Sequence, residues 1–249
     1  MTVIDRYDEF ARIEAQYPRR IGSDNLMPAE LRIKFNSGLV AVYADDKGLF
    51  IFERREGFHK LHFRIAGTDA VLPEHDGILA AYLTYREGRY PSDAANWLRA
   101  QGFTKKKTII RHTAIQLNGN VSSEGIVTAT ADEVYSMFGE YFSEIETDFP
   151  SRGQFIETDT YCLRSAGGEP LGIFYDMGRT RIIAVSQRAR KQGIGRRLYL
   201  GFAAAKLREN GNFVFHAWIN PENTPSLALF HSMGFTQDDT MTDCFVRRK

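Results

Sequence analysis

The sequence predicts an α/β fold of the α+β type, built as two similar halves that each hold a mixed, mostly antiparallel sheet flanked by helices. Runs of β-branched and aromatic residues, separated by short turn signals, occur in both halves and indicate strands. Stretches with apolar residues at helical spacing stand before and after these runs. A direct repeat, AQGFTKKKT at 100–108 and SMGFTQDDT at 232–240, follows a helical pattern in each copy. We therefore expect the second half to repeat the element order of the first.

The first half begins with a helical pattern and continues with a three-stranded meander. Turn signals separate three strand-like runs, and a fourth strand precedes a second helix. The segment between the meander and the fourth strand leaves no room for a long helix. The expected elements are a helix at 5–17, strands at 39–44, 48–54, 59–65 and 78–87, and a helix at 92–100.

The second half begins with a strand at 126–130, after which Thr130 and Glu133 form the pattern of a capping box before a helical run to residue 142. Two strand-like runs then flank the hairpin signal AGGE, and a third follows the turn MGRT. The remaining expected elements are strands at 160–165, 170–176 and 181–186, a helix from 194 that Gly211 ends, a strand at 213–219, a helix at 226–233 and a strand at 240–248.

A polar stretch, QLNGNVSSEG at 116–125, is typical of a linker between two domains. It places the predicted boundary between domains at 1–119 and 120–249. A chain of 249 residues is long enough for two small domains of this kind.

The composition is that of an ordinary globular protein, with 43% hydrophobic and 25% charged residues. Lysine and arginine total 32 against 31 acidic residues, so no global field attracts nucleic acid or an anionic membrane. The N-terminal stretch has no apolar segment of the kind that directs secretion, and no run approaches the roughly 18 apolar residues of a membrane span. We therefore expect a cytoplasmic protein that binds neither nucleic acid nor membrane.

Several residues that often mark special chemistry have ordinary interpretations here. Cys162 and Cys244 are expected to be reduced, buried thiols. His59 and His62 should face opposite sides of one strand, so no metal site is expected. The basic run at 105–107 is interpreted as a solvated strand edge.

The stretch AVSQRARKQGIGRRLY at 184–199 places two glycines and five basic residues between a strand and a helix. A helix N-terminus presents unpaired N–H groups and a partial positive charge, and glycines let a ligand approach the backbone closely. The stretch therefore predicts a site for a polyphosphate. It lacks the third glycine of the dinucleotide pattern, since Leu198 stands there, and it contains no Walker sequence.

The segment VSQRARKQGIG resembles the pyrophosphate-binding motif of the GNAT superfamily of N-acetyltransferases, (R/Q)xxGx(G/A), with Arg190, Gly193 and Gly195 in register. A second family signature follows at the right distance in NTPSLALFHSMGF. The matching residues there are Asn223, Ser226, Leu229, Phe230, Gly234 and Phe235. The resemblance covers roughly residues 125–249. The first half shows the element order without the motif, and we interpret it as a degenerate GNAT-like domain without a coenzyme site.

The resemblance implies acetyl-coenzyme A as cosubstrate, with its pantetheine arm along the strand at 181–186. Backbone groups of Ile183 and Val185 would hold the arm, and the Val185 N–H would also polarise the thioester carbonyl. The coenzyme-binding residues that the resemblance implies are Ile183, Val185, Arg190, Lys191, Gln192, Gly193, Ile194, Gly195, Arg196, Asn223, Ser226 and Phe230.

The sequence departs from the family at Phe230, where relatives often have a tyrosine that protonates the departing thiolate. The acid is therefore open: another group, water, or an unassisted thiolate. His216 is the first candidate for the general base, because an unperturbed histidine has a pKa of about 6.5. Asp176, Tyr175 and Glu222 are weaker candidates, and His231 lies on the helix about 100 degrees from Phe230.

The sequence thus indicates an acetyl-coenzyme A dependent N-acetyltransferase that acts on a primary amine, and the expected acceptor is a small molecule. One alternative is a non-catalytic module that binds or senses coenzyme A. Another is an interaction protein whose loop binds a different phosphate. The identity of the acceptor and the oligomeric state cannot be read from the sequence.

Overall fold

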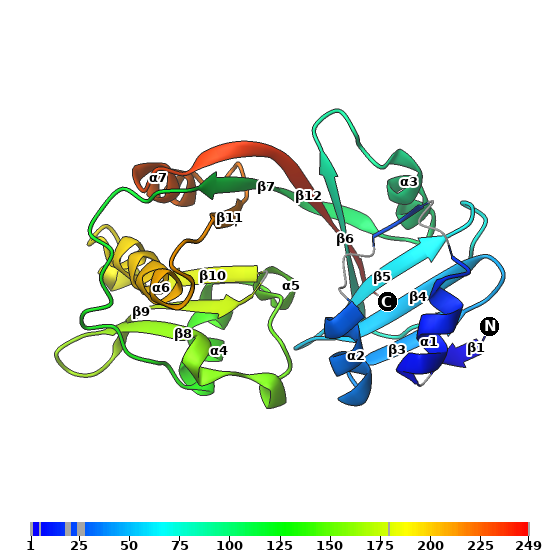
Figure 1. Cartoon of the computed structure of the whole chain (residues 1–249), viewed down its shortest axis with the longest axis horizontal. Coiled ribbons are helices and arrows are strands. Elements are labelled where there is room, and N and C mark those ends of the chain that lie inside the picture. Colours follow the sequence, from blue (N-terminus) through cyan, green and yellow to red (C-terminus); the bar gives the residue numbers. More distant parts are fainter. Residues whose placement is uncertain (1, 5, 18–20, 24–27, 179, 249) are drawn as a thin grey trace. The chain divides into compact units, whose positions relative to one another are not determined.

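A computed structural model describes residues 2–4, 6–17, 21–23, 28–178 and 180–248 (Figure 1). The chain forms two compact units. The first comprises Met1–Ile109 together with Thr240–Lys249, and the second comprises Ile110–Asp239. The predicted division at 119/120 thus differs from the units in two ways. The change of unit comes ten residues earlier than predicted, after Ile109, and the C-terminal strand is part of the first unit.

The strands of the first unit follow the predicted meander. They form a sheet in the order β1-β3-β4-β5-β6-β12, and β2 (Ile21–Gly22) pairs with β5. All pairs in this order are antiparallel except β5 with β6. The strands are β1 (Thr2–Ile4), β3 (Val40–Ala44), β4 (Gly48–Arg54), β5 (His59–Ile65), β6 (Ile78–Arg86) and β12 (Thr236–Arg248).

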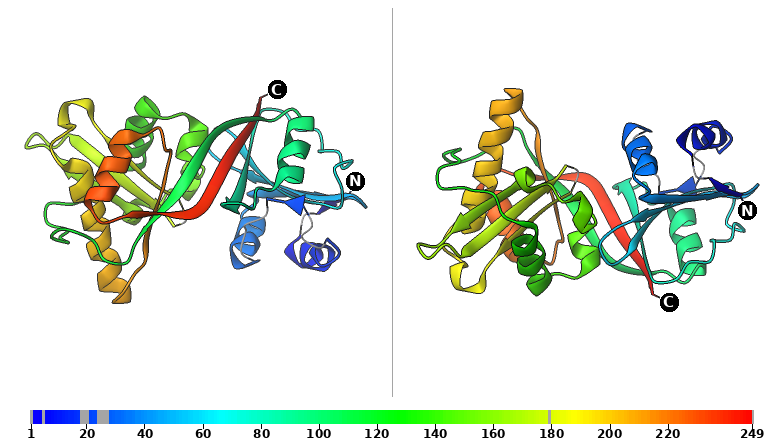
Figure 2. Two further views of the ribbon diagram at one scale, coloured as in Figure 1. Left: turned by 90° about the horizontal axis from the view of Figure 1, so that it is seen from above. Right: turned by 90° about the horizontal axis from the view of Figure 1, so that it is seen from below.

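Helices cover both faces of this sheet (Figure 2). On one face α1 (Tyr7–Glu14) and α2 (Pro28–Asn36) bury Phe10 and Leu31 against alternate residues of β3 and β4. On the other face α3 (Ser92–Ala100) buries Trp97 among phenylalanines of β4 and β5. The helix expected at 5–17 is shorter in the structure, where α1 covers only Tyr7–Glu14. The helix α2 was not predicted, because its apolar residues show little helical periodicity.

A buried group of charges lies on the α2 face of the first unit. Glu53 on β4 is 2% exposed, and its carboxylate lies 2.7 Å from the Lys34 ammonium, 2.9 Å from Arg55 and 3.0 Å from His62. Burial alone would raise the pKa of Glu53, but the His62 hydrogen bond and the charges of Arg55 and Lys34 outweigh it and hold the pKa far below its usual range. Burial lowers the pKa of His62. His62 is therefore neutral and donates to the carboxylate, while His59 contacts His75 instead.

The second unit contains the three-stranded sheet β10-β9-β8, all antiparallel, and an antiparallel ladder of β7 with β11. The helix α4 (Ala131–Tyr141) packs on one face of the three-stranded sheet and α6 (Ile194–Asn210) packs on the other (Figure 2). The helix α7 (Thr224–Ser232) joins the core on the α6 side. The strands are β7 (Thr104–Ala114), β8 (Thr160–Arg164), β9 (Pro170–Met177), β10 (Thr180–Val185) and β11 (Phe215–Ile219), and a short helix, α5, spans Glu144–Thr147.

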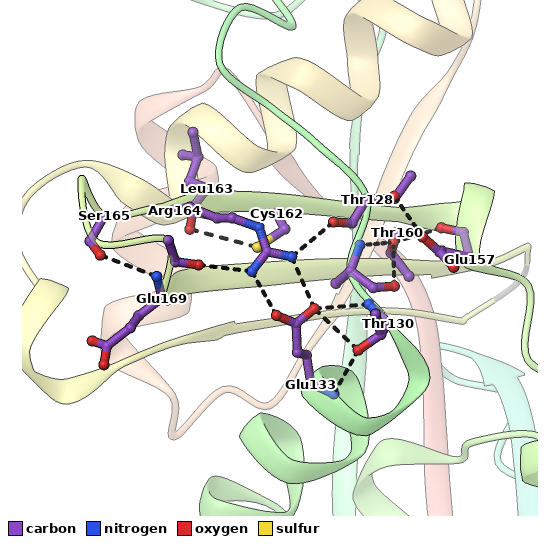
Figure 3. A network of polar contacts seen from close by, with 12 residues as sticks. Thr128, Thr130, Glu133, Glu157, Thr160, Cys162, Leu163, Arg164, Ser165 and Glu169 are labelled. Carbon is purple, nitrogen blue, oxygen red and sulfur yellow. Dashed lines mark hydrogen bonds and ion pairs between the residues drawn. The ribbon is translucent and has the colours of Figure 1, made fainter.

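The predicted capping box at the start of α4 is present (Figure 3). The Thr130 hydroxyl accepts from the Glu133 N–H, and the Glu133 carboxylate accepts from the Thr130 N–H. The same carboxylate also receives two bonds from Arg164 of β8, at 2.6 and 3.0 Å. These bonds from Arg164 are the main reason why the pKa of Glu133 falls to about 2. Glu133 therefore both caps α4 and links this helix to β8 of the neighbouring sheet.

The last strand of each half pairs with a strand of the other half. Residues 110–114 of β7 lie antiparallel to β11 inside the second unit, and residues 240–248 of β12 lie antiparallel to β6 inside the first. The exchange explains why a linear boundary does not describe the units. A fragment that began at residue 120 would lack the ladder partner of β11.

The direct repeat corresponds to the same local structure in each half. The helix α3 ends before Gly102 and the helix α7 before Gly234, and a strand follows each. The Phe103 N–H bonds to the Leu98 carbonyl at 3.0 Å, and the Phe235 N–H bonds to the Phe230 carbonyl at 3.2 Å. Both phenylalanines are buried. The repeated residues therefore form the same helix C-terminus, followed by a buried phenylalanine, in each half.

Two predictions about particular side chains can be compared with the described residues. Cys162 and Cys244 are buried thiols, as predicted, and they form no disulfide among the described residues. Lys105 forms an ion pair at 2.8 Å with the buried Asp243, so this lysine is less solvated than the sequence suggested. In the part of the chain that the structure describes, no helix is long and apolar enough to cross a membrane.

Candidate functional site

The strand β10 is an edge strand whose outer hydrogen-bonding groups face away from β9. The Ser186 N–H bonds to the Leu171 carbonyl at 3.0 Å, which fixes the alternation of the antiparallel ladder. By that alternation, Ala184 and Ile182 bond to β9, whereas Ile183 and Val185 direct their N–H and C=O groups outward. These are the two residues that the sequence assigned to the coenzyme arm. The backbone geometry is therefore suitable for an extended ligand along this edge.

A 3₁₀ turn (Gln187–Ala189) and a short loop connect β10 to the start of α6. Gly193 is the N-cap residue at φ 74°, and Lys191 also has a positive φ of 62°. Positive φ is uncommon for a residue with a side chain, and alternating conformations of this kind turn successive N–H groups toward one point. No side chain caps the first turn of the helix, and a Cβ built on Gly193 would meet no atom within 4 Å among the described residues. The helix start therefore has backbone donors, positive dipole and room for an anion.

The first turn of α6 lies close against its neighbours because residue 195 is glycine. A Cβ at Gly195 would lie 3.3 Å from the Leu229 side chain and 3.7 Å from the Val185 side chain. The two family motifs therefore meet here, since Gly195 belongs to the first and Leu229 to the second. A larger residue would move the helix start away from β10 and α7.

The basic side chains of the loop do not all surround the helix start. Arg190 lies over the Tyr141 ring at 4.9 Å, and its Nε donates to the Val185 carbonyl in a long bond of 3.4 Å. Arg188 pairs with Glu169. Arg196 donates to the Asn118 carbonyl at 2.7 Å, and its other donors reach Ser232. Arg196, which the sequence placed among the coenzyme ligands, thus has a structural role, because it connects α6 to the end of α7 and to the segment after β7.

One hydroxyl at this site was missed by the sequence analysis. Ser186 directly follows β10, and its Oγ is buried without a hydrogen-bond partner among the described residues. A buried hydroxyl normally has a partner, so an unpaired one next to an open strand edge fits contact with a ligand. No sequence signal could have identified it, because only the packing of the loop buries this atom.

The residues of the second signature shape the start and the core face of α7. The Asn223 side chain is the N-cap and accepts from the Ser226 N–H at 3.1 Å. These two residues, predicted as coenzyme ligands, therefore bind each other. Phe230 is 8% exposed and meets the rings of Tyr199 and Phe235 edge-on at 5.1 and 5.0 Å. Phe230 is thus part of the core cluster that fixes α7 against α6.

Tyr199 packs beside Phe230 and carries the hydroxyl that Phe230 lacks. The residue is 1% exposed, and its Oη has no hydrogen-bond partner among the described residues. Burial raises the pKa of Tyr199 above its usual range, so the hydroxyl keeps its proton. Nothing in the sequence distinguishes this tyrosine, since it lies in the middle of an apolar helical pattern.

His216 on β11 contacts Arg181 of β10, with 3.0 Å between its Nε2 and an Nη of the arginine. Burial lowers the pKa of His216, and the positive charges of Arg181 and Arg111 lower it further. Among the weaker candidates, Asp176 forms an ion pair with Arg181, Tyr175 is a buried core residue, and Glu222 is exposed. The ring of His231 faces His112 at 5.6 Å. Within the described ranges, no three His, Cys, Asp or Glu side chains gather as metal ligands.

The corresponding place in the first unit is arranged differently. There β5 and β6 pair directly as parallel strands, from His59 opposite Leu79 to Leu61 opposite Ala81. In the second unit β10 and β11 occupy the same positions in the element order, but each is the last strand of a different sheet. Residues 66–77, which the structure describes throughout, form no helix between β5 and β6. The first unit therefore offers neither an open strand edge nor a helix start at this position.

The tandem arrangement defines a class of known folds. The chain is similar in structure to a GCN5-related N-acetyltransferase from Sphaerobacter thermophilus, with a TM-score of 0.54, 11% identity and coverage of 90% of this chain and 86% of that one. It is also similar to a GNAT-family acetyltransferase from Colwellia psychrerythraea, with a TM-score of 0.52, 12% identity and coverage of 100% and 99%. A tandem GNAT protein from the clavulanic acid biosynthesis pathway matches with a TM-score of 0.53, 12% identity and coverage of 97% and 93%.

The family comparison matches part of the second half of the sequence. Residues 173–246, from β9 to β12, match the model of the FR47-like protein family. A search of curated protein sequences found no match. The chain therefore has the fold of tandem GNAT proteins, as its sequence predicted, and its second half contains the match to the FR47-like family.

Proposed function

We propose that the protein is an acetyl-coenzyme A dependent N-acetyltransferase that acts on a primary amine. The observation that carries the proposal is the combination of an open strand edge, at Ile183 and Val185 of β10, with the N-terminus of α6, where Gly193 provides no side-chain cap. An extended arm with amide groups and a pyrophosphate at one end has the chemistry to match it. Open space at Gly193 and the buried hydroxyl of Ser186, which has no partner among the described residues, support such a ligand here.

The residues that would hold the coenzyme differ from the full set that the motifs suggest. Backbone groups of Ile183 and Val185 would bind the arm, and the N–H groups at the start of α6 would bind the pyrophosphate. Lys191, Gln192 and Ile194 would contribute chiefly through this backbone. The bound coenzyme supplies an acetyl group activated as a thioester.

This chain's own part in the reaction is orientation and charge stabilisation. The outward Val185 N–H is a fixed donor for the oxygen of the reacting carbonyl, and donors of this kind are worth about 3 kcal/mol in related sites. The amine must lose a proton, and His216 is badly placed to take it because Arg181 occupies its Nε2. We propose that water removes this proton.

The second candidate function is a coenzyme A binding or sensing module without catalysis. Two observations favour it: Phe230 is a buried core residue without a hydroxyl, and the Nε2 lone pair of His216 is directed at Arg181. Both candidates require coenzyme binding, but only the first requires turnover.

The experiment combines calorimetry with a thiol assay on the full chain. We expect acetyl-coenzyme A to bind, and free thiol to be released only when a pool of primary amines is added. Binding without thiol release across pools of amino acids, polyamines, amino sugars and lysine peptides would favour the sensing module. Absence of binding by both acetyl-coenzyme A and coenzyme A would reject both candidates.

Replacement of Ser186 by alanine tests the hydroxyl at the end of β10. We expect coenzyme A affinity to fall about fivefold, because a hydrogen bond of about 1 kcal/mol is lost. The stability of the free protein should not decrease, since the Oγ has no partner among the described residues. Calorimetry and thermal unfolding measure the two effects. Loss of stability with unchanged affinity would show that Ser186 serves the fold alone.

A further inference from the structure

Arg181 and His216 connect two strands of the second unit that do not pair with each other. Arg181 is the second residue of β10, and His216 is the second residue of β11. The strand β10 is the edge of the three-stranded sheet, while β11 belongs to the ladder with β7. The contact of 3.0 Å between their side chains therefore lies where both strands begin.

The chemistry of the two groups fixes the direction of this bond. A guanidinium has donors only, so the Nε2 of His216 must accept. An accepting Nε2 requires a neutral imidazole whose proton is on Nδ1. The lowered pKa of His216 keeps the ring neutral at pH 7.

A carboxylate holds Arg181 from the other side. Asp176 of β9 is the direct antiparallel neighbour of Arg181, and its Oδ1 lies 3.0 Å from the arginine Nε. The side chains of Arg181 and Asp176 are 10% and 8% exposed. The guanidinium also lies over the rings of Phe202 and Phe213, at 5.1 and 5.8 Å. Its orientation is therefore fixed by an ion pair, a hydrogen bond and two aromatic rings.

We infer that Asp176, Arg181 and His216 form a positioning relay that sets the separation of β10 and β11 at the end where both strands begin. Asp176 orients Arg181, and Arg181 in turn holds His216. The inference rests on the proposed function in one respect, because the coenzyme arm is taken to lie along the open edge of β10. His216 is then a positioning residue that acts as an acceptor, and it is not the general base that its sequence suggested.

The relay depends on pH through the protonation of His216. The charged groups that act on His216 are Arg181 of β10, Arg111 of β7 and Asp176 of β9. Lys206 of α6 lies 3.7 Å from Asp176, and Arg111 is paired with Asp238. Protonation of His216 would place a second positive charge against Arg181. Since burial and nearby positive charges lower the folded pKa of His216, the relay is intact at the ordinary value of about 6.5 and is lost only as the pH falls through the lower folded pKa.

The first test uses two variants of the full chain, His216→Gln and His216→Leu. Glutamine has a carbonyl oxygen that accepts from Arg181, whereas leucine has no acceptor. We expect the glutamine variant to bind coenzyme A within about twofold of the wild type and the leucine variant to lose about tenfold, as for a lost bond to a charged group. Equal losses in both variants, or no loss in the leucine variant, would overturn the relay. His216 is only partly buried on β11, so both variants should fold.

The second test does not depend on coenzyme binding. Nuclear magnetic resonance of the imidazole nitrogens should show the Nδ1–H tautomer and a pKa below about 6.5 in the wild type. The pKa of His216 should rise in Arg181→Met, because the adjacent positive charge is removed. It should stay low in Arg181→Lys, which keeps the charge and serves as the second variant if the methionine variant does not fold. An Nε2–H tautomer in the wild type would overturn the relay. Absence of coenzyme binding in the wild type would reject the proposed function and leave this test valid.

Discussion

Replacement of Gly193 by aspartate is expected to weaken coenzyme A binding by more than about tenfold, which corresponds to a loss of at least about 1.4 kcal/mol of binding free energy. The new carboxylate would stand at the N-cap of α6, where the pyrophosphate is proposed to bind, and like charges at short range repel strongly. The space around the Cβ position is open, so no clash is expected. Aspartate is also a favourable N-cap residue, which offsets strain from the positive φ.

The matched control is Gly193→Asn, which has the same shape without the charge. Asparagine accepts positive φ more readily than most residues, so this variant should fold and lose much less affinity. Arg190→Ala is the second comparison, and we expect a smaller loss because Arg190 lies over Tyr141 and not at the helix start. Calorimetry with coenzyme A measures all three. Unchanged affinity in the aspartate variant, with the fold intact, would mean that the loop is only a structural turn.

Replacement of Glu53 by glutamine is expected to destabilise the first unit by about 3 kcal/mol, because it removes one partner of a buried ion cluster. Lys34, Arg55 and His62 all contact this carboxylate, which is almost completely buried. The neutral amide cannot balance the charges of Lys34 and Arg55. The control is Glu87→Gln, which makes the same change on the surface. Because exposed substitutions have small effects, we expect it to change the free energy of unfolding by less than about 0.5 kcal/mol.

The two tryptophans allow this effect to be assigned to one unit. Trp97 is buried in the first unit and Trp218 lies in the second, so urea unfolding in a Trp218→Phe background reports on the first unit. The pKa of Glu53 is depressed in the folded state, so its stabilisation is present above the ordinary value of about 4.3 and is lost as the pH falls. The glutamine variant should lack this part of the acid dependence. Equal unfolding of wild type and variant at neutral pH would contradict the role of the cluster.

The sequence by itself determined the local features of both halves. Thr130 and Glu133 predicted the capping box, and the repeated Gly-Phe pairs predicted the helix endings. The order of strands and helices predicted two similar halves, and the resemblance of two motifs to the GNAT superfamily implied their fold. These features depend on backbone dihedral angles and on hydrogen bonds between residues close in the chain, so the sequence pattern carries them directly. The turn before α6 is of the same kind, because Gly193 supplies its conformation.

Only the tertiary structure decided which distant groups meet. The pairing of β12 with β6, and of β7 with β11, joins residues of opposite halves, and period-two alternation does not say which strand a strand will pair with. The direction of Arg196 toward Asn118 and the contact of Arg181 with His216 depend likewise on packing between elements. A long side chain has many rotamers of similar energy, and its neighbours choose among them. The sequence could therefore name the residues near the candidate site, but the fold selected which of them bind each other and which remain available for a ligand.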